Sequence, residues 1–138
     1  MSFILIDTSL GTVLVVDDNG VNRQLTVDVL RHHGYRVIEA AGGEEAVSLT
    51  EQHRPALIVL DIQMPNVSGL DVLRILRHHD DRYIATTPII AATALAMAGD
   101  RERCLGAGAN DYLARPFSLS ALVDAVRRLL KQQTPAHD

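Results

Sequence analysis

The sequence predicts an α/β protein whose strands form an open, doubly wound parallel sheet. Five short apolar runs recur along the chain, and segments with a helical spacing of apolar residues separate them. Most of the runs are continuously apolar, which is typical of parallel strands that helices cover on both faces. Crossovers in such a sheet are right-handed, and the ligand site is expected at the carboxyl ends of the strands.

Residues that interrupt regular structure separate the apolar runs from the helical segments. Gly34 follows the first helical segment, Pro55 ends the second, and Pro88 precedes the fourth run. The fifth apolar run gives much the weakest indication of a strand. The runs are Val13–Val16, Tyr35–Ile38, Leu57–Leu60, Ile89–Ala92 and Tyr112–Leu113.

The helical segments carry apolar residues three or four positions apart. Val21, Leu25 and Val29 mark the first helix. The last helix is the clearest, with Ser118 as its expected N-cap and a long apolar stripe after it. This stripe consists of Leu119, Leu122, Val123, Val126, Leu129 and Leu130. The other face carries Asp124, Arg127, Arg128 and Lys131.

Length and composition indicate one soluble domain. The chain has 138 residues, and 47% of them are hydrophobic, which is enough for a core. The formal net charge is -4 with scattered Lys and Arg residues, so direct nucleic-acid binding is not expected. A single cysteine, Cys104, and apolar runs far shorter than a membrane span indicate a cytoplasmic protein without membrane association. We assign residues 12–131 to the domain, 1–11 to a leader or extra strand, and 132–138 to a tail.

Polar side chains follow the predicted strands at the edge where a ligand is expected. They are Asp17 and Asp18 after the first strand, Asp61 after the third, Thr93 after the fourth and Arg115 after the fifth. Three carboxylates that converge at one edge repel one another unless a cation neutralises them. Mg²⁺ binds a few carboxylates together with waters and phosphate oxygens, and no Cys/His set has the spacing of a zinc site. The sequence therefore predicts a Mg²⁺ site.

These polar residues belong to motifs that occur in a characteristic order. The motifs are Val15-Val16-Asp17-Asp18-Asn19, Leu60-Asp61-Ile62-Gln63-Met64-Pro65, Gly69, Thr93-Ala94 and Arg115-Pro116-Phe117. With them the chain resembles the receiver domain of response regulators in two-component signalling. The resemblance covers nearly the whole chain and implies a flavodoxin-like (βα)5 fold with the strand order 2-1-3-4-5.

The resemblance also implies the role of each site residue. Asp61 would accept a phosphoryl group from a phosphohistidine on a sensor histidine kinase or a phosphotransfer protein. The implied ligands of Mg²⁺ are Asp17, Asp18, Asp61 and the backbone carbonyl of Gln63. Thr93 would bind the phosphoryl group, and Tyr112 would rotate inward and change the surface formed by the fourth helix, fifth strand and fifth helix, which a downstream protein reads. The resemblance therefore implies a signalling switch that would assist only its own phosphorylation and dephosphorylation.

One departure from the family pattern keeps an alternative open. Arg115 stands where receivers ordinarily carry lysine, and the planar guanidinium prefers bidentate carboxylate or phosphate contacts. We expect phosphorylation with altered coupling to the output surface, and the alternative is a pseudo-receiver that signals without phosphate. A haloacid dehalogenase phosphatase is disfavoured because Gln63, rather than a second aspartate, stands two residues after Asp61. A dinucleotide-binding Rossmann unit is disfavoured because no Gly-x-Gly-x-x-Gly follows the first strand.

Overall fold

In the computed structural model, which describes residues 11–93, 97–114 and 118–133, five strands form one parallel sheet. The strands are β1 (Thr12–Val16), β2 (Arg36–Ala40), β3 (Leu57–Asp61), β4 (Ile89–Thr93) and β5 (Asp111–Ala114). Their order is β2-β1-β3-β4-β5, and every neighbouring pair is parallel. The expected sheet and its strand order are thus confirmed. The predicted leader lies outside the described residues, apart from Gly11.

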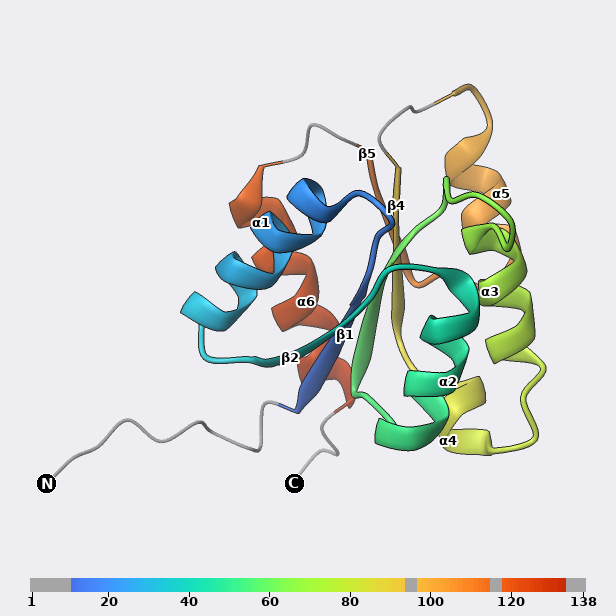
Figure 1. Cartoon of the computed structure of the whole chain (residues 1–138), viewed down its shortest axis with the longest axis horizontal. Coiled ribbons are helices and arrows are strands. Elements are labelled where there is room, and N and C mark those ends of the chain that lie inside the picture. The colour runs from blue at the N-terminus through green and yellow to red at the C-terminus, as the bar shows by residue number, and fades with distance from the viewer. Residues whose placement is uncertain (1–10, 94–96, 115–117, 134–138) are drawn as a thin grey trace, which may run out of the picture.

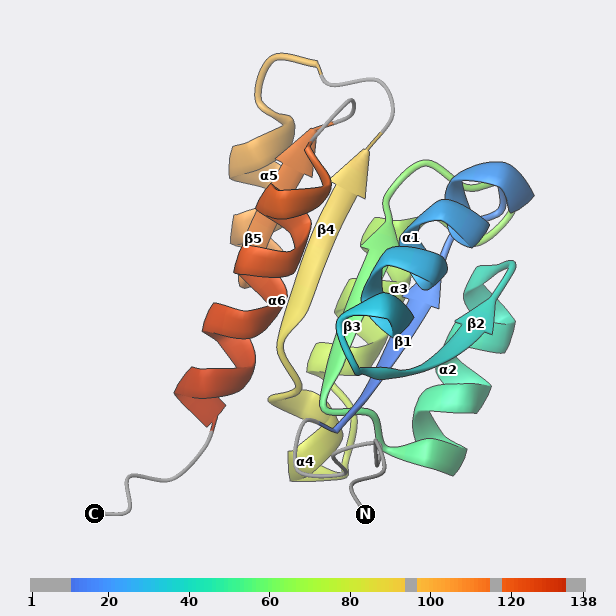
Figure 2. The same ribbon diagram turned by 90° about the vertical axis from the view of Figure 1, so that its left-hand side faces the viewer.

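Helices cover both faces of the sheet (Figures 1 and 2). They are α1 (Gly20–His32), α2 (Gly43–His53), α3 (Gly69–Arg77), α4 (Arg82–Ala85), α5 (Asp100–Gly106) and α6 (Leu119–Gln133). Helices α1 and α6 lie on one face, and α2, α3 and α5 lie on the other. The last helix extends two residues into the segment predicted as a tail.

The five-repeat prediction missed one helix. Helix α4 occupies the connection between α3 and β4, so the fourth helix of the repeat is α5 and the fifth is α6. Asp81 caps α4, because its carboxylate accepts a hydrogen bond from Tyr83 N at 2.9 Å. A helix of four residues is too short to show an apolar period, which explains why the pattern did not reveal it.

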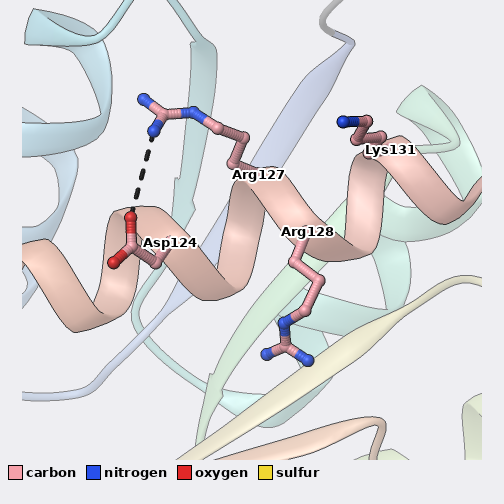
Figure 3. Close-up of a pocket in the computed structure, with 4 residues that line it drawn as sticks. All are labelled: Asp124, Arg127, Arg128 and Lys131. Carbon is pink, nitrogen blue, oxygen red and sulfur yellow. Dashed lines mark ion pairs between the residues drawn. The ribbon is translucent and has the colours of Figure 1, made fainter.

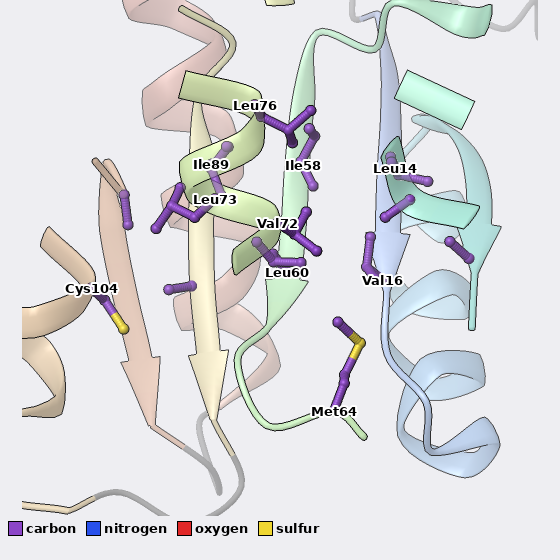
Figure 4. Close-up of a cluster of buried hydrophobic side chains, with 14 of the residues drawn as sticks. Leu14, Val16, Ile58, Leu60, Met64, Val72, Leu73, Leu76, Ile89 and Cys104 are labelled. Atoms are coloured by element: carbon purple, nitrogen blue, oxygen red, sulfur yellow. The ribbon is translucent and has the colours of Figure 1, made fainter. Parts of the chain in front are cut away.

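Alternate residues of the strands pack into two separate hydrophobic cores, one on each face of the sheet. Leu14, Ile58 and Ile89 pack with α2 and α3 in a first core (Figure 4). Val13 and Val59 point the other way and pack with α1 and α6 in a second core. Each such fully buried side chain stabilises the fold by about 1.5–3 kcal/mol. The continuous apolar runs are explained by this burial on both faces.

The strand ends differ slightly from the prediction. Strand β2 begins at Arg36 rather than Tyr35, because Tyr35 N donates to the carbonyl of Leu30 at 3.2 Å and closes the end of α1. Gly34 between them has a φ of 93°, a left-handed conformation that glycine adopts without steric cost. Asp61 and Thr93, expected just beyond their strands, are the final strand residues.

The buried face of α1 is not the one that the sequence pattern indicated. Val21 and Leu25, two of the three residues whose spacing marked this helix, are 78% and 52% exposed, whereas the third, Val29, is partly buried against the second core. Thr26, Val27 and Leu30 are buried instead, and the last two belong to the second core. Residues four apart mark one face of a helix, but α1 also carries Val27 and Leu30 on a different face, so the apolar spacing did not fix its rotation.

The prediction for α6 is mostly correct. Ser118 caps it as expected, with Ala121 N donating to Ser118 Oγ at 3.0 Å. Four residues of the predicted stripe are buried, but Leu119 in the first turn is exposed. Figure 3 shows the polar face, on which Arg127 pairs with Asp124 at 3.9 Å.

Side-chain contacts link helices and loops at the amino ends of β3, β4 and β5. Arg54 forms an ion pair with Asp81, and its guanidinium lies 4.7 Å from the centroid of the Tyr83 ring. The Tyr83 hydroxyl donates to the carbonyl of Pro55 at 3.2 Å. Arg77 reaches from the end of α3 to the residues before β4 and β5. We call these five residues the amino-end network.

Candidate functional site

Three carboxylates meet at the carboxyl edge of the sheet. Asp17 and Asp18 follow β1, and Asp61 ends β3, the neighbouring strand. One carboxylate oxygen from each of the three residues lies within 4.8 Å of the other two. The parallel register, which sets Val16 beside Leu60, produces this convergence. We call these three side chains the acidic pocket.

Backbone hydrogen bonds hold the acidic pocket in place. Asp17 N donates to the carbonyl of Ala40 at 3.1 Å, which ties the end of β1 to β2. The Asp17 carboxylate accepts from Asn19 N at 2.9 Å, and the Asp61 carboxylate accepts from Gln63 N at 3.0 Å. Asp17 and Asp61 are buried, whereas Asp18 is exposed. The pocket is therefore rigid at its base and open to solvent on one side.

The electrostatics of the acidic pocket favour a cation. Burial, together with the nearby carboxyl groups of Asp17 and Asp18, raises the pKa of Asp61 from 3.8 to about 7, although the hydrogen bond from Gln63 N opposes this rise. Without a cation, the ionised form of Asp61 is thus disfavoured. Three carboxylate oxygens at this separation match the hard oxygen ligands that Mg²⁺ prefers. The residues present fit the predicted metal.

The loop between β3 and α3 fits tightly against the phosphoacceptor candidate. Gly69 N donates to the carbonyl of Ile62 at 3.0 Å, so α3 begins directly against the end of β3. A Cβ atom on Gly69 would lie 2.3 Å from the Asp61 backbone oxygen, which only glycine avoids. Asn66 in the same loop has a φ of 67°. Gly69 therefore shapes this loop.

The remaining predicted residues are placed as follows. Thr93 is buried at the end of β4, one position beyond Ala92, which pairs with Asp61. Tyr112 lies on β5, partly buried against the first core, and burial raises the pKa of its hydroxyl. Gln63 is exposed, and the metal-binding role of its carbonyl stays a prediction. Arg115 lies outside the described residues, with Ala94, Leu95, Pro116 and Phe117.

One residue beside the site was not singled out from the sequence. Arg23 donates from Nη1 to the backbone carbonyl of Asp17 at 2.8 Å and from Nε to the Glu39 carboxylate at 3.0 Å. A weak signal was present, because a cation near the start of a helix opposes the helix dipole and so suggests a partner elsewhere. The partner on β2 could not be known before the fold.

The comparisons with known proteins agree with this geometry. A family model for the response regulator receiver domain matches residues 13–127. The chain belongs to the receiver-domain family. The two alternatives based on a haloacid dehalogenase phosphatase and a Rossmann unit are therefore set aside.

Several receiver proteins resemble this chain over most of its length. The polar-differentiation response regulator DivK of Brucella anthropi is 40% identical over 119 residues, which is 86% of this chain and 95% of that protein. The receiver domain of the sensor histidine kinase PA1611 from Pseudomonas aeruginosa, solved with a magnesium ion in its active site cleft, is 40% identical with a TM-score of 0.80 and covers 88% of this chain and 98% of its own. A putative response regulator from Chloroflexus aurantiacus is 35% identical with a TM-score of 0.82, over 88% of this chain and 98% of that one.

Membrane insertion has no support in the described part of this receiver domain. Its longest helix, α6, carries Arg127, Arg128 and Lys131 on its polar face. No helix among the described residues combines the length and the apolar character that a bilayer span requires.

Proposed function

We propose that this receiver domain is a phosphorylation-dependent switch of a two-component phosphorelay, in which Asp61 accepts a phosphoryl group from a histidine kinase or a phosphotransfer protein. The observation that carries the proposal is the acidic pocket, where carboxylate oxygens from two adjacent strands lie within 4.8 Å of one another. We place the protein in the cytoplasm, where a thiol such as that of the buried Cys104 stays reduced.

The acidic pocket has the donor set for a divalent cation. We propose that Mg²⁺ is held by Asp17, Asp18, Asp61 and the Gln63 carbonyl, and offsets the charge between the Asp61 carboxylate and the incoming phosphoryl group. The magnesium ion described for the PA1611 receiver supports this choice. Asp18 is exposed and leaves a path for the donor side chain.

The proposed transfer needs little chemistry from the protein beyond positioning. An oxygen of the Asp61 carboxylate forms a bond to phosphorus while the phosphorus–nitrogen bond of the phosphohistidine breaks. The electron pair of that bond stays on the imidazole nitrogen. Gln63 N, which donates to Asp61 Oδ1 at 3.0 Å, holds the carboxylate in one orientation during the attack. Thr93 and Arg115 are proposed to contact the phosphoryl oxygens.

The switch is proposed to act through the helix-covered edge next to β5. The new phosphoryl group adds about -1.5 to -2 charges and three acceptor oxygens. Thr93 would donate to one of them, and Tyr112, two strands from Asp61, would follow inward. The surface that changes is formed by α5, β5 and α6, and Met97 and Leu105 supply exposed apolar contacts on it for a downstream protein.

The phosphodonor is proposed to dock on α1. This helix starts two residues after Asp18, so its first turns adjoin the acidic pocket. Val21 and Leu25 are exposed there at 78% and 52%, although the helix has another face for the core. Apolar side chains beside a reaction site favour contact with a protein over contact with a small molecule.

Mass spectrometry of the intact protein tests the proposal. With Mg²⁺ and phosphoramidate the wild type should gain one phosphoryl group, and a chelator should abolish the gain. Asp61→Asn should gain none, whereas Asp71→Asn, which changes an exposed aspartate on α3, should behave as the wild type does. A wild type that never gains mass supports the pseudo-receiver alternative, and a gain that persists in Asp61→Asn assigns the phosphoryl group to another residue.

A further inference from the structure

We propose that Arg23 is a positioning residue that sets the geometry of the acidic pocket for its cation. This inference rests on the Mg²⁺ binding proposed above and assigns a role to a residue outside the ligand set. Its guanidinium bridges the Asp17 carbonyl on one side and the Glu39 carboxylate on the other, at 2.8 and 3.0 Å. Arg23 thus connects α1, the β1–α1 loop and β2 at the edge of the pocket.

The contacts around Asp17 explain why this bridge matters. The Asp17 N–H is fixed by Ala40 at the end of β2, and the Asp17 carboxylate accepts from Asn19 N. Arg23 adds a bond to the Asp17 carbonyl, so contacts from three directions orient Asp17, and the bond from Arg23 is the one that orients the Asp17–Asp18 peptide unit. Asp18 follows directly in the chain, and the direction of its side chain depends on that peptide unit. Partners that orient metal ligands commonly change metal affinity by 10- to 100-fold.

Glu39 makes the bridge rigid. The Arg23 and Glu39 side chains are only 23% and 34% exposed, and their charge-assisted hydrogen bond uses the Nε position of the planar fork. A lysine in place of Arg23 would carry the same charge but could not reach both partners with a fixed geometry. An experiment can therefore distinguish the effect of the Arg23 charge from the effect of the geometry of its hydrogen bonds.

The positioning role and a purely electrostatic role predict opposite results. Arg23 is a cation close to a site for a cation, so its charge alone opposes Mg²⁺ binding. If charge were its only effect, Arg23→Gln would bind Mg²⁺ more tightly. If Arg23 orients Asp17 and Asp18, the same substitution weakens binding.

The chain contains a closely matched control on the same helix. Arg31 also lies on α1 and also donates to a backbone carbonyl of β2, that of Val37, at 3.0 Å. It does so near the opposite end of the strand, away from the acidic pocket. Arg31→Gln therefore removes the same charge and the same kind of bond without touching the peptide unit of Asp17.

Isothermal titration calorimetry with Mg²⁺ alone tests the inference on the full chain. We expect Arg23→Gln to weaken Mg²⁺ binding by about tenfold, in the range for ligand-orienting partners, and Arg31→Gln to stay within about twofold of the wild type, as expected for a screened, distant charge. Arg23→Lys, which keeps the charge, should also bind several-fold more weakly, and it remains informative if Arg23→Gln fails to fold.

The outcomes distinguish this inference from the proposed function. Tighter binding by Arg23→Gln, equal affinities of Arg23→Gln and Arg31→Gln, or wild-type affinity of Arg23→Lys would overturn the positioning role while the wild type still binds Mg²⁺. A wild type that binds no Mg²⁺ would overturn the proposed function and this inference together.

Discussion

Arg77 Nε donates a hydrogen bond to the carbonyl oxygen of Gly108 at 2.9 Å, which joins the end of α3 to the turn before β5. The same guanidinium donates to the Thr87 carbonyl at 2.8 Å and to Asn110 Oδ1 at 2.7 Å. Gly108 has a φ of 114°, and a Cβ atom there would lie 2.8 Å from Arg77 Cγ. Arg77 thus acts as a shared donor for two chain segments, the residues before β4 and the turn before β5.

Replacement of Arg77 should destabilise the protein. Arg77→Met keeps much of the apolar stem but leaves partly buried carbonyl groups without their donor, so we expect a loss of about 2 kcal/mol in the free energy of unfolding. Urea denaturation measures this loss. Arg74→Met is the control, because Arg74 is exposed on the same helix and its ion pair with Asp71 spans 3.7 Å. Equal stability of the two variants would contradict the prediction.

Gly69→Ala should destabilise the protein and disturb the acidic pocket. The added Cβ would meet the Asp61 backbone oxygen at 2.3 Å and Ile62 Cα at 2.5 Å, and neither atom belongs to a flexible side chain. We expect a loss of about 2–4 kcal/mol, measured by thermal unfolding. Gly106→Ala is the control, because nothing lies within 4 Å of the added Cβ in α5, and a gain of up to about 1 kcal/mol is expected. A Gly69→Ala variant as stable as the wild type would contradict the close approach of Gly69 to the backbone of Asp61 and Ile62.

The stability of the cation-free protein should fall as the pH rises through the neutral range. Burial raises the pKa of Asp61 from 3.8 to about 7, so between these values the folded chain holds one more proton than the unfolded chain. The stabilisation from this proton is complete below about pH 4 and is lost as the pH rises through 7. Asp61→Asn mimics the neutral form and should be more stable than the wild type at pH 8, on the order of 2–4 kcal/mol.

Unfolding in a chelating buffer at pH 4 and pH 8 measures the effect of Asp61→Asn. The two proteins should differ little at pH 4, where the wild-type carboxyl is already protonated. Mg²⁺ at pH 8 should reduce the difference, because it stabilises the ionised carboxylate only in the wild type. If the difference in stability between Asp61→Asn and the wild type did not change with pH, burial of the Asp61 charge could not be the cause of that difference.

Leu25→Ser should slow phosphorylation by a protein donor without slowing phosphorylation by a small one. Leu25 is 52% exposed on α1, so its replacement removes a contact surface while the core stays intact. We expect a loss of about 1–2 kcal/mol in donor binding, or roughly tenfold in the transfer rate at low concentration. Ile75→Ser, at a 47% exposed position on α3, is the control. Equal rates for both variants with a protein donor would remove α1 from the docking surface.

Much of the fold can be predicted from the sequence, because parallel strands that are buried on both faces form continuous apolar runs. The run from Leu57 to Leu60 is apolar on both sides, and the structure buries all of it between the two cores. The acidic pocket follows from the same rule, since Asp17 and Asp61 had to meet once β1 and β3 were neighbours.

Other features depend on packing that the pattern of apolar residues along the sequence does not reveal. The rotation of α1 is set by Val27 and Leu30 against the second core, and Val21 and Leu25, which share the helical spacing, are exposed. Arg23 and Glu39 are 16 residues apart in the sequence, and the packing of α1 against β2 brings them together.

The amino-end network lies at the opposite end of the strands from the acidic pocket, so its contacts support the fold without touching the three carboxylates. We expect substitutions of Arg54, Arg77 or Tyr83 to change the free energy of unfolding while the three carboxylates keep their spacing.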